Sequence, residues 1–186
     1  MLALFARLGL TWTFAMWAPL VAMLLAIVFL DIDHYWIPDV LSFPAMALAA
    51  LGALLPDGIG IVAALLGLLP ALGLWLVAKI FAALTHREGM GLGDIKLLAA
   101  LGLSLGVLPT IILVLLASLQ GTVIGVIILA TGGHKPKVAS ADGWTPHARA
   151  VPFGPFLVLA CFEIVLLPDV FLGLPLSLLR LGGDAF

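Results

Sequence analysis

Long apolar stretches separated by short polar ones run through almost the whole sequence. Between Arg7 and Asp31 there are 23 consecutive uncharged residues, and about 20 apolar residues in a helix are enough to cross the hydrocarbon layer of a bilayer. Helix breakers such as Pro109 divide the longer apolar stretches. The pattern predicts an all-α integral membrane protein, a bundle of six transmembrane helices that forms one membrane-embedded domain over residues 1–186. The helices are expected at about residues 9–30, 38–55, 60–84, 94–107, 109–131 and 151–174.

Three polar stretches, residues 31–39, 85–94 and 132–150, fall on the same side of the membrane if the helices alternate in direction. Cytoplasmic loops of membrane proteins carry an excess of Lys and Arg. Arg7 and Arg180 lie on the opposite side, whereas the other six basic residues lie in or beside the three stretches. We therefore expect these loops in the cytoplasm and both termini outside, in the inner membrane of the cell. The six residues are Lys79, Arg87, Lys96, Lys135, Lys137 and Arg149.

The composition agrees with a membrane protein and excludes several other classes. Hydrophobic residues make up 64% of the chain and charged residues 10%, with a mean hydropathy of +1.30, which lies outside the range of soluble domains. A net charge of −2 without a basic cluster gives no reason to expect a nucleic-acid partner. The single cysteine, Cys161, excludes an intramolecular disulfide and a Cys-rich zinc site. We interpret it as a packing residue, and the four scattered histidines do not predict a metal site.

Two aspartates carry the strongest indication of chemistry. Asp31 ends the first predicted helix and Asp94 begins the fourth, so helix alternation places both at the cytoplasmic face. A pair of carboxyls can hydrolyse a peptide bond, because one ionised group activates water while its protonated partner polarises the carbonyl. Two carboxyls a few ångströms apart do not both ionise readily, so we expect one proton to be shared across the pair.

Four further residues are expected to support this pair. Gly91 and Gly93 precede Asp94 in a glycine-rich turn, where they allow close backbone approach and positive φ. Asp39 follows Pro38 at the start of the second predicted helix, and we expect it to cap that helix. Lys96 lies two residues after Asp94. We expect it either to lower the pKa of a nearby carboxylate or to extend its ammonium to the membrane interface.

Three motifs occur in a fixed order along the chain. They are DIDHYWIPD at residues 31–39, REGMGLGDIKLLAALG at residues 87–102 and PFGPF at residues 152–156. Together they resemble the catalytic membrane portion of the bacterial type IV prepilin peptidases, over about residues 20–165. The resemblance implies a GxGD-type membrane aspartyl protease with Asp31 and Asp94 as catalytic residues. It implies prepilins or type II secretion pseudopilins as substrates, cut at the cytoplasmic membrane face to remove their leader peptides.

The resemblance does not include one domain that many members of the family carry. Many members carry an amino-terminal cytoplasmic domain whose paired CxxC motifs bind zinc, a domain associated with N-methylation of the new amino terminus. Because Cys161 is the only cysteine here, we expect proteolysis without methyl transfer, and neither a metal ion nor another cofactor.

Two other functions stay open on the sequence alone. Glu163 falls about 18 Å along the last predicted helix, at ~1.5 Å per residue, where a carboxylate is a candidate proton or ion site. That placement would fit a small proton-coupled transporter, although a hydrogen-bonded packing role for Glu163 is an equal alternative. An inactive, peptidase-like assembly factor that binds prepilins would also keep the same scaffold.

Overall fold

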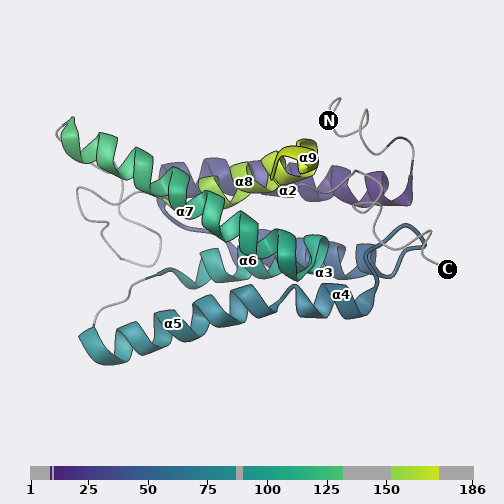
Figure 1. The fold of residues 1–186 in the computed structure, drawn as a ribbon, viewed down its shortest axis with the longest axis horizontal. Coiled ribbons are helices and arrows are strands. Elements are labelled where there is room, and N and C mark those ends of the chain that lie inside the picture. The colour runs from purple at the N-terminus through teal and green to yellow at the C-terminus, as the bar shows by residue number, and fades with distance from the viewer. Residues whose placement is uncertain (1–8, 10, 87–89, 132–151, 172–186) are drawn as a thin grey trace.

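The computed structural model describes residues 9, 11–86, 90–131 and 152–171, which form helices and turns, with no strand among them. The expected all-α fold is therefore confirmed over the described residues. Figure 1 shows the helices packed side by side along one long direction. They are α2 (Trp12–His34), α3 (Asp39–Ala53), α4 (Ile61–Leu66), α5 (Leu69–Thr85), α6 (Leu92–Leu105), α7 (Val107–Ala130), α8 (Gly154–Leu166) and α9 (Pro168–Phe171).

Three helical stretches are long and apolar enough to cross a membrane. They cover Trp12–His34, Ile61–Thr85 and Val107–Ile128, with hydropathies of 2.3, 2.4 and 2.6. The helices α3, α6 and α8 have 15, 14 and 13 residues, which gives lengths of about 20–23 Å against a hydrocarbon layer of about 30 Å. The structure therefore supports a multi-pass membrane protein, and it does not establish that six helices each span the bilayer.

Several helix boundaries differ from the predicted ones because a glycine or a proline interrupts or ends a helix there. The helix expected at residues 60–84 is interrupted between α4 and α5, at Gly67. The break expected at Pro109 falls instead at Gly106, whose φ of 81° ends α6. Pro109 then lies in the first turn of α7, where a missing backbone N–H costs nothing because that N–H has no partner within the helix. Pro168 similarly separates α8 from α9.

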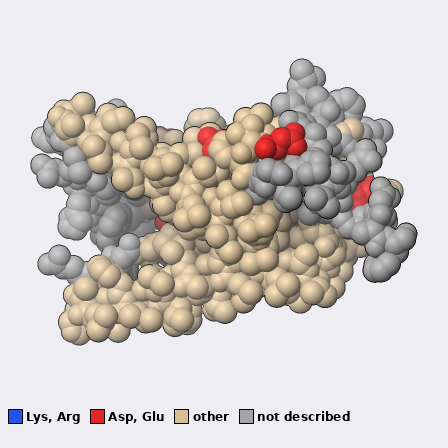
Figure 2. Space-filling model, viewed as in Figure 1, with Lys and Arg blue, Asp and Glu red and all other residues tan. Residues whose placement is uncertain are grey.

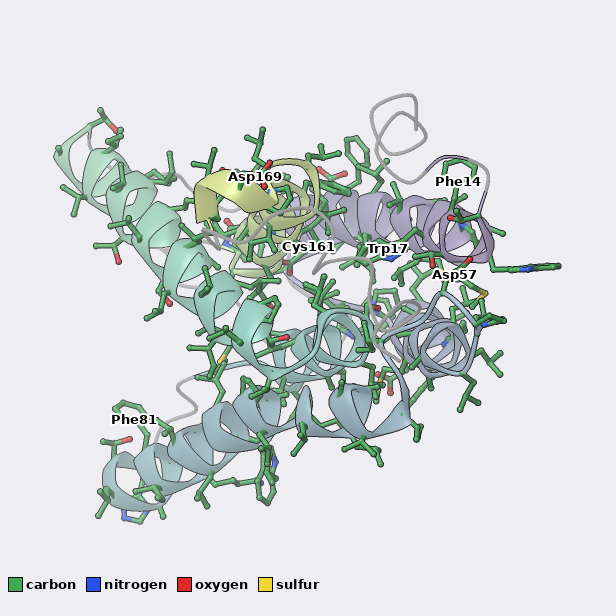
Figure 3. All side chains as sticks on the ribbon, turned by 45° about the vertical axis from the view of Figure 1, so that its right-hand side comes forward. Phe14, Trp17, Asp57, Phe81, Cys161 and Asp169 are labelled. Atoms are coloured by element: carbon green, nitrogen blue, oxygen red, sulfur yellow. The ribbon has the colours of Figure 1, made fainter. Side chains whose placement is uncertain are left out.

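Helix α6 forms the centre of the bundle. Its Leu97, Leu98 and Leu101 are fully buried, and α6 packs against α3, α4, α5, α7 and α8. Cys161 of α8 is also fully buried in this core, and Figure 3 shows it in the interior of the bundle. The outward faces of α5 and α7 carry exposed Leu, Ile and Val side chains. In Figure 2 most of the visible described surface is tan, with a few red acidic groups and no blue, and few charges are expected where a surface contacts lipid tails.

The break between α4 and α5 allows two backbones to touch. A Cβ atom added to Gly67 would lie 1.9 Å from the carbonyl oxygen of Gly102, and one added to Gly102 would lie 2.0 Å from the carbonyl oxygen of Gly67. Small residues permit such close approach between membrane helices. Neither position accepts a larger residue unless α4 and α6 move apart.

We predict that Gly102→Ala lowers the free energy of unfolding by about 1–3 kcal/mol, the range for overpacking a tight interface. The matched control is Gly73→Ala in α5, because a Cβ at Gly73 meets no atom within 4 Å. That control should be neutral or stabilising by up to about 1 kcal/mol, since alanine is the better helix former. Thermal unfolding in detergent measures both, and equal stability of the two variants would contradict the backbone contact.

Candidate active site

Three segments far apart in the sequence meet around the side chain of Ile37. Ile37 lies between α2 and α3 and is only 5% exposed. A Cβ atom added to Gly93 would lie 2.9 Å from the Cβ of Ile37, and one added to Gly154 would lie 3.2 Å from its Cδ1. The α2–α3 connection, the start of α6 and the start of α8 therefore converge at one end of the bundle.

Asp31 lies in the last turn of α2 and is buried, with 5% exposure. Its Oδ2 atom accepts a hydrogen bond of 3.0 Å from the backbone N–H of Gly154. The helix ends at Tyr35, which has a left-handed φ of 53° and donates its backbone N–H to the Asp31 carbonyl at 2.9 Å. The following Ile37-Pro38 sequence continues as an extended connection, because a residue before proline disfavours helical geometry. Hydrogen bonds to both the backbone carbonyl and the carboxyl of Asp31 thus hold this residue in place.

Asp94 lies in the first turn of α6 and is partly buried. It directly follows Gly93, which packs against Ile37, and Ile37 also packs against Gly154, the donor to Asp31, so the two aspartates lie at the same end of the bundle. The glycine-rich turn delivers Asp94 to the start of a helix as expected, although α6 begins at Leu92, two residues earlier than predicted. The arrangement brings together two carboxyls from distant helices in a largely apolar setting, where they cannot both carry a charge at low cost.

The two glycines before Asp94 do not use positive φ, contrary to the prediction. Gly91 is the N-cap of α6 with an ordinary φ of −69°, and Gly93 is absent from the left-handed glycines of the described chain, which are Gly9, Gly60 and Gly106. Close approach explains Gly93 instead, because Ile37 occupies the space of its missing side chain. At Gly91 a Cβ would meet only Asp94 Oδ2 at an ordinary 3.7 Å.

Asp39 does not cap its helix, which corrects the sequence-based expectation. Pro38 is the N-cap of α3 and makes no side-chain capping bond, while Asp39 is the first helical residue. The Asp39 carboxylate instead forms an ion pair with Lys96, at 2.5 Å between Oδ1 and Nζ. Lys96 is therefore engaged with α3 and does not simply extend to the membrane interface. A local sequence pattern could not show this contact, because the two residues are 57 positions apart.

The sequence reasoning missed three residues of this site. Ile37 and Gly154 hold the segments together, and their only sequence signal was membership of the first and third motifs. Tyr35 lies close to the pair as well. Burial raises the pKa of its phenol above the ordinary value, and the neighbouring Asp31 carboxylate adds to the increase.

Glu163 has a partner inside the bundle. Gln120 of α7 donates a hydrogen bond of 2.6 Å from its Nε2 to Oε2 of the half-buried Glu163 in α8. The buried Gln120 Oε1 has no hydrogen-bond partner among the described residues. The contact between Gln120 and Glu163 joins α7 to α8.

Other polar candidates lie outside this cluster. Asp33, His34 and His86 are exposed. Within the described ranges, no group of three His, Cys, Asp or Glu side chains is placed to hold a metal ion. The remaining predicted loop residues lie outside the described part of the chain: Arg87, His134, Lys135, Lys137, His147 and Arg149.

An open cavity of about 310 Å³ lies beside the start of α8. Ser118, Gly121 and Thr122 of α7 line it together with Phe153 and Phe156. Gly154, the hydrogen-bond donor to Asp31, lies between these two phenylalanines in the sequence, whereas neither Asp31 nor Asp94 lines the cavity.

Comparison with known proteins identifies relatives of the chain. The model of the type IV leader peptidase family matches residues 18–126, a range that contains Asp31 and Asp94 but not Gly154. The chain is 38% identical over 168 residues to a prepilin leader peptidase/N-methyltransferase of Pseudomonas aeruginosa, covering 87% of this chain and 52% of the relative. It is 36% identical over 162 residues to the protein of that name from Aeromonas salmonicida, covering 82% and 51%. The chain therefore spans about half the length of these relatives, and no solved structure matches it significantly.

We predict that Gly93→Ala lowers the free energy of unfolding by about 1–3 kcal/mol, because the new methyl group collides with Ile37. Gly91→Ala is the matched control in the same turn and should cost less than about 1 kcal/mol, the effect of a poorer N-cap residue. Thermal unfolding in detergent again gives the measurement. A larger loss for Gly91→Ala than for Gly93→Ala would contradict the close packing of Ile37.

Proposed function

Because the chain belongs to the type IV leader peptidase family, we propose that it is a membrane aspartyl endopeptidase that removes leader peptides from type IV prepilins or type II secretion pseudopilins. Asp31 and Asp94 are its proposed catalytic pair. One observation carries the assignment: the segments that hold these two aspartates, far apart in the chain, meet around Ile37, where the three motifs converge.

The proposed reaction uses the pair as a general base and a general acid. One carboxylate accepts a proton from water, whose oxygen attacks the scissile carbonyl carbon, while the protonated partner donates to the carbonyl oxygen. Collapse of the tetrahedral gem-diol breaks the C–N bond. The leaving nitrogen takes up a proton from the pair, while one hydroxyl of the gem-diol returns its proton to the pair as the new carboxyl group forms. The Gly154 N–H, bound to Asp31 Oδ2, orients that carboxyl during this cycle. Once both products have left, the pair again holds one proton, as at the start.

The proposed location is the inner membrane, with the site at the cytoplasmic face. The exposed apolar faces of α5 and α7 support a lipid environment. The position of the aspartates at one end of the bundle supports a site at a membrane surface. A scissile bond next to an apolar substrate helix could reach such a site while that helix stays in the bilayer.

The proposal covers peptide cleavage alone. The relatives' names also include N-methyltransferase, but the chain corresponds to about half of each relative. The family match does not favour the transporter alternative, and the hydrogen bond from Gln120 supports a packing role for Glu163. An inactive assembly factor differs from the proposal only in turnover, which the first experiment below measures.

Asp31→Asn and Asp94→Asn should each reduce cleavage of a prepilin in vesicles by about 10³-fold or more, because either change removes the acid–base pair. Both variants should insert and fold, since an Asn side chain fits the space of Asp and its carbonyl oxygen can still accept from Gly154. Electrophoresis of substrate and product measures the rate.

Asp57→Asn provides the matched control for these two variants. Asp57 is exposed, and its carbonyl accepts a hydrogen bond from Thr13 at the start of α2, whereas Asp31 lies in the last turn of that helix; Figure 3 shows Asp57 beside the start of α2. Its variant should cleave at the wild-type rate. Normal cleavage by Asp31→Asn or Asp94→Asn would refute the proposed pair, and binding of prepilin without turnover by the wild type would favour the assembly factor.

Glu163→Gln should keep cleavage within about threefold of wild type, because an amide can still bond to Gln120 at a cost of about 1 kcal/mol or less. Proton flux into liposomes should be the same for this variant and the wild type. A flux that disappears in Glu163→Gln and persists in Asp31→Asn would instead support the transporter.

A further inference from the structure

The ion pair between Asp39 and Lys96 links the start of α3, which follows the segment that holds Asp31, to α6, which holds Asp94. The Lys96 Nζ lies 2.5 Å from Asp39 Oδ1 and 5.2 Å from the ring centroid of Phe43. Asp39 and Phe43 are one helical turn apart, so they present a carboxylate and an aromatic face from the same side of α3. The ammonium of Lys96 is thus held by α3 at two points.

These contacts lie on either side of Asp94. Ile37 packs against Gly93, the residue directly before Asp94, and Asp39 binds Lys96, two residues after it. The same short stretch of chain at the start of α3 therefore contacts the first turn of α6 before and after Asp94. Two such contacts restrict the rotation of that turn about the helix axis, which one contact alone would not do.

The ion pair is too exposed to contribute much to folding. The side chains of Lys96 and Asp39 are 31% and 56% exposed, and pairs of this kind contribute about 0–1 kcal/mol because solvent screens them. The packing of α3 on the buried face of α6 is sufficient to hold the two helices together. The direction of a carboxyl is more sensitive, since a displacement of about 1 Å can reduce a rate by up to about 100-fold.

We propose that Asp39 and Lys96 are positioning residues that act as a unit to direct the Asp94 carboxyl towards Asp31. The inference rests on the proposed function and adds residues that need not touch the substrate or the reacting atoms. It differs from a role in which either charge binds a charged part of the substrate, because such a role would not require the two residues to act together.

Steady-state cleavage of a prepilin in vesicles tests the proposal through Asp39→Asn, Lys96→Met and the double variant. Each single change should lower kcat about tenfold with KM unchanged, and the double variant should lose no more than either single one. The charge-reversed pair, Asp39→Lys with Lys96→Glu, should recover part of the loss. Lys79→Met is the matched control, because Lys79 also lies over an aromatic ring, Trp75 at 5.9 Å, but on α5. Its kcat should stay at the wild-type value.

Losses that multiply to about 100-fold in the double variant would overturn the proposal, as would a change in KM without a change in kcat. Unchanged kcat in both single variants would also overturn it. These outcomes are distinct from failure of the proposed function, which would appear as an inactive wild type.

A second measurement does not depend on activity. Labelling of Asp94 by a carbodiimide, read by peptide mass spectrometry, reports how its carboxyl is presented. Labelling should change at least twofold, and to the same extent, in Asp39→Asn, Lys96→Met and the double variant, while Lys79→Met should match the wild type. Labelling that is the same in all of these proteins would overturn the proposal even if the wild type cleaves nothing.

Discussion

The candidate site depends on close approach around Ile37, where Gly93 and Gly154 leave room for its side chain. This contact brings the end of α2, the start of α6 and the start of α8 to one place. The Gly154 N–H can reach the Asp31 carboxyl only because no side chain intervenes; a Cβ there would lie 2.6 Å from Asp31 Oδ2. Gly93 and Gly154 are thus needed for close packing. That packing sets the positions of the two aspartates.

The membrane imposes a second constraint, since polar groups in hydrocarbon need partners within the protein. Buried hydroxyls satisfy it inside their own helices: Ser42 donates to the carbonyl of Pro38, and Thr110 donates to that of Gly106. Gln120 and Glu163 satisfy it between helices α7 and α8. Asp31 and Asp94 differ from these groups because the fold places two acids at the same end of the bundle around Ile37, and acids gathered in this way are common where carboxyls perform chemistry.

The packing that stabilises the bundle extends into the proposed site. The apolar face of α6 and the Gly67–Gly102 contact hold the helices together, and at the site end Ile37 packs against Gly93 and Gly154. The family match covers residues 18–126, which include both aspartates, yet the donor to Asp31 comes from Gly154 beyond that range. The proposed site therefore includes the start of α8, which lies beyond the range that the family model matches.

The sequence by itself determined that the chain is helical and membrane-embedded, because apolar length and charge distribution are local properties. It also indicated Asp31 and Asp94, since both flank apolar stretches in motifs of a known kind. It could not reveal the partner of Asp39, for which capping was the local expectation, nor the roles of Ile37 and Gly154. Those were decided by the tertiary structure, since contacts across 57 and 123 residues depend on how the helices pack. Periodicity describes one helix at a time, whereas the site is formed between helices.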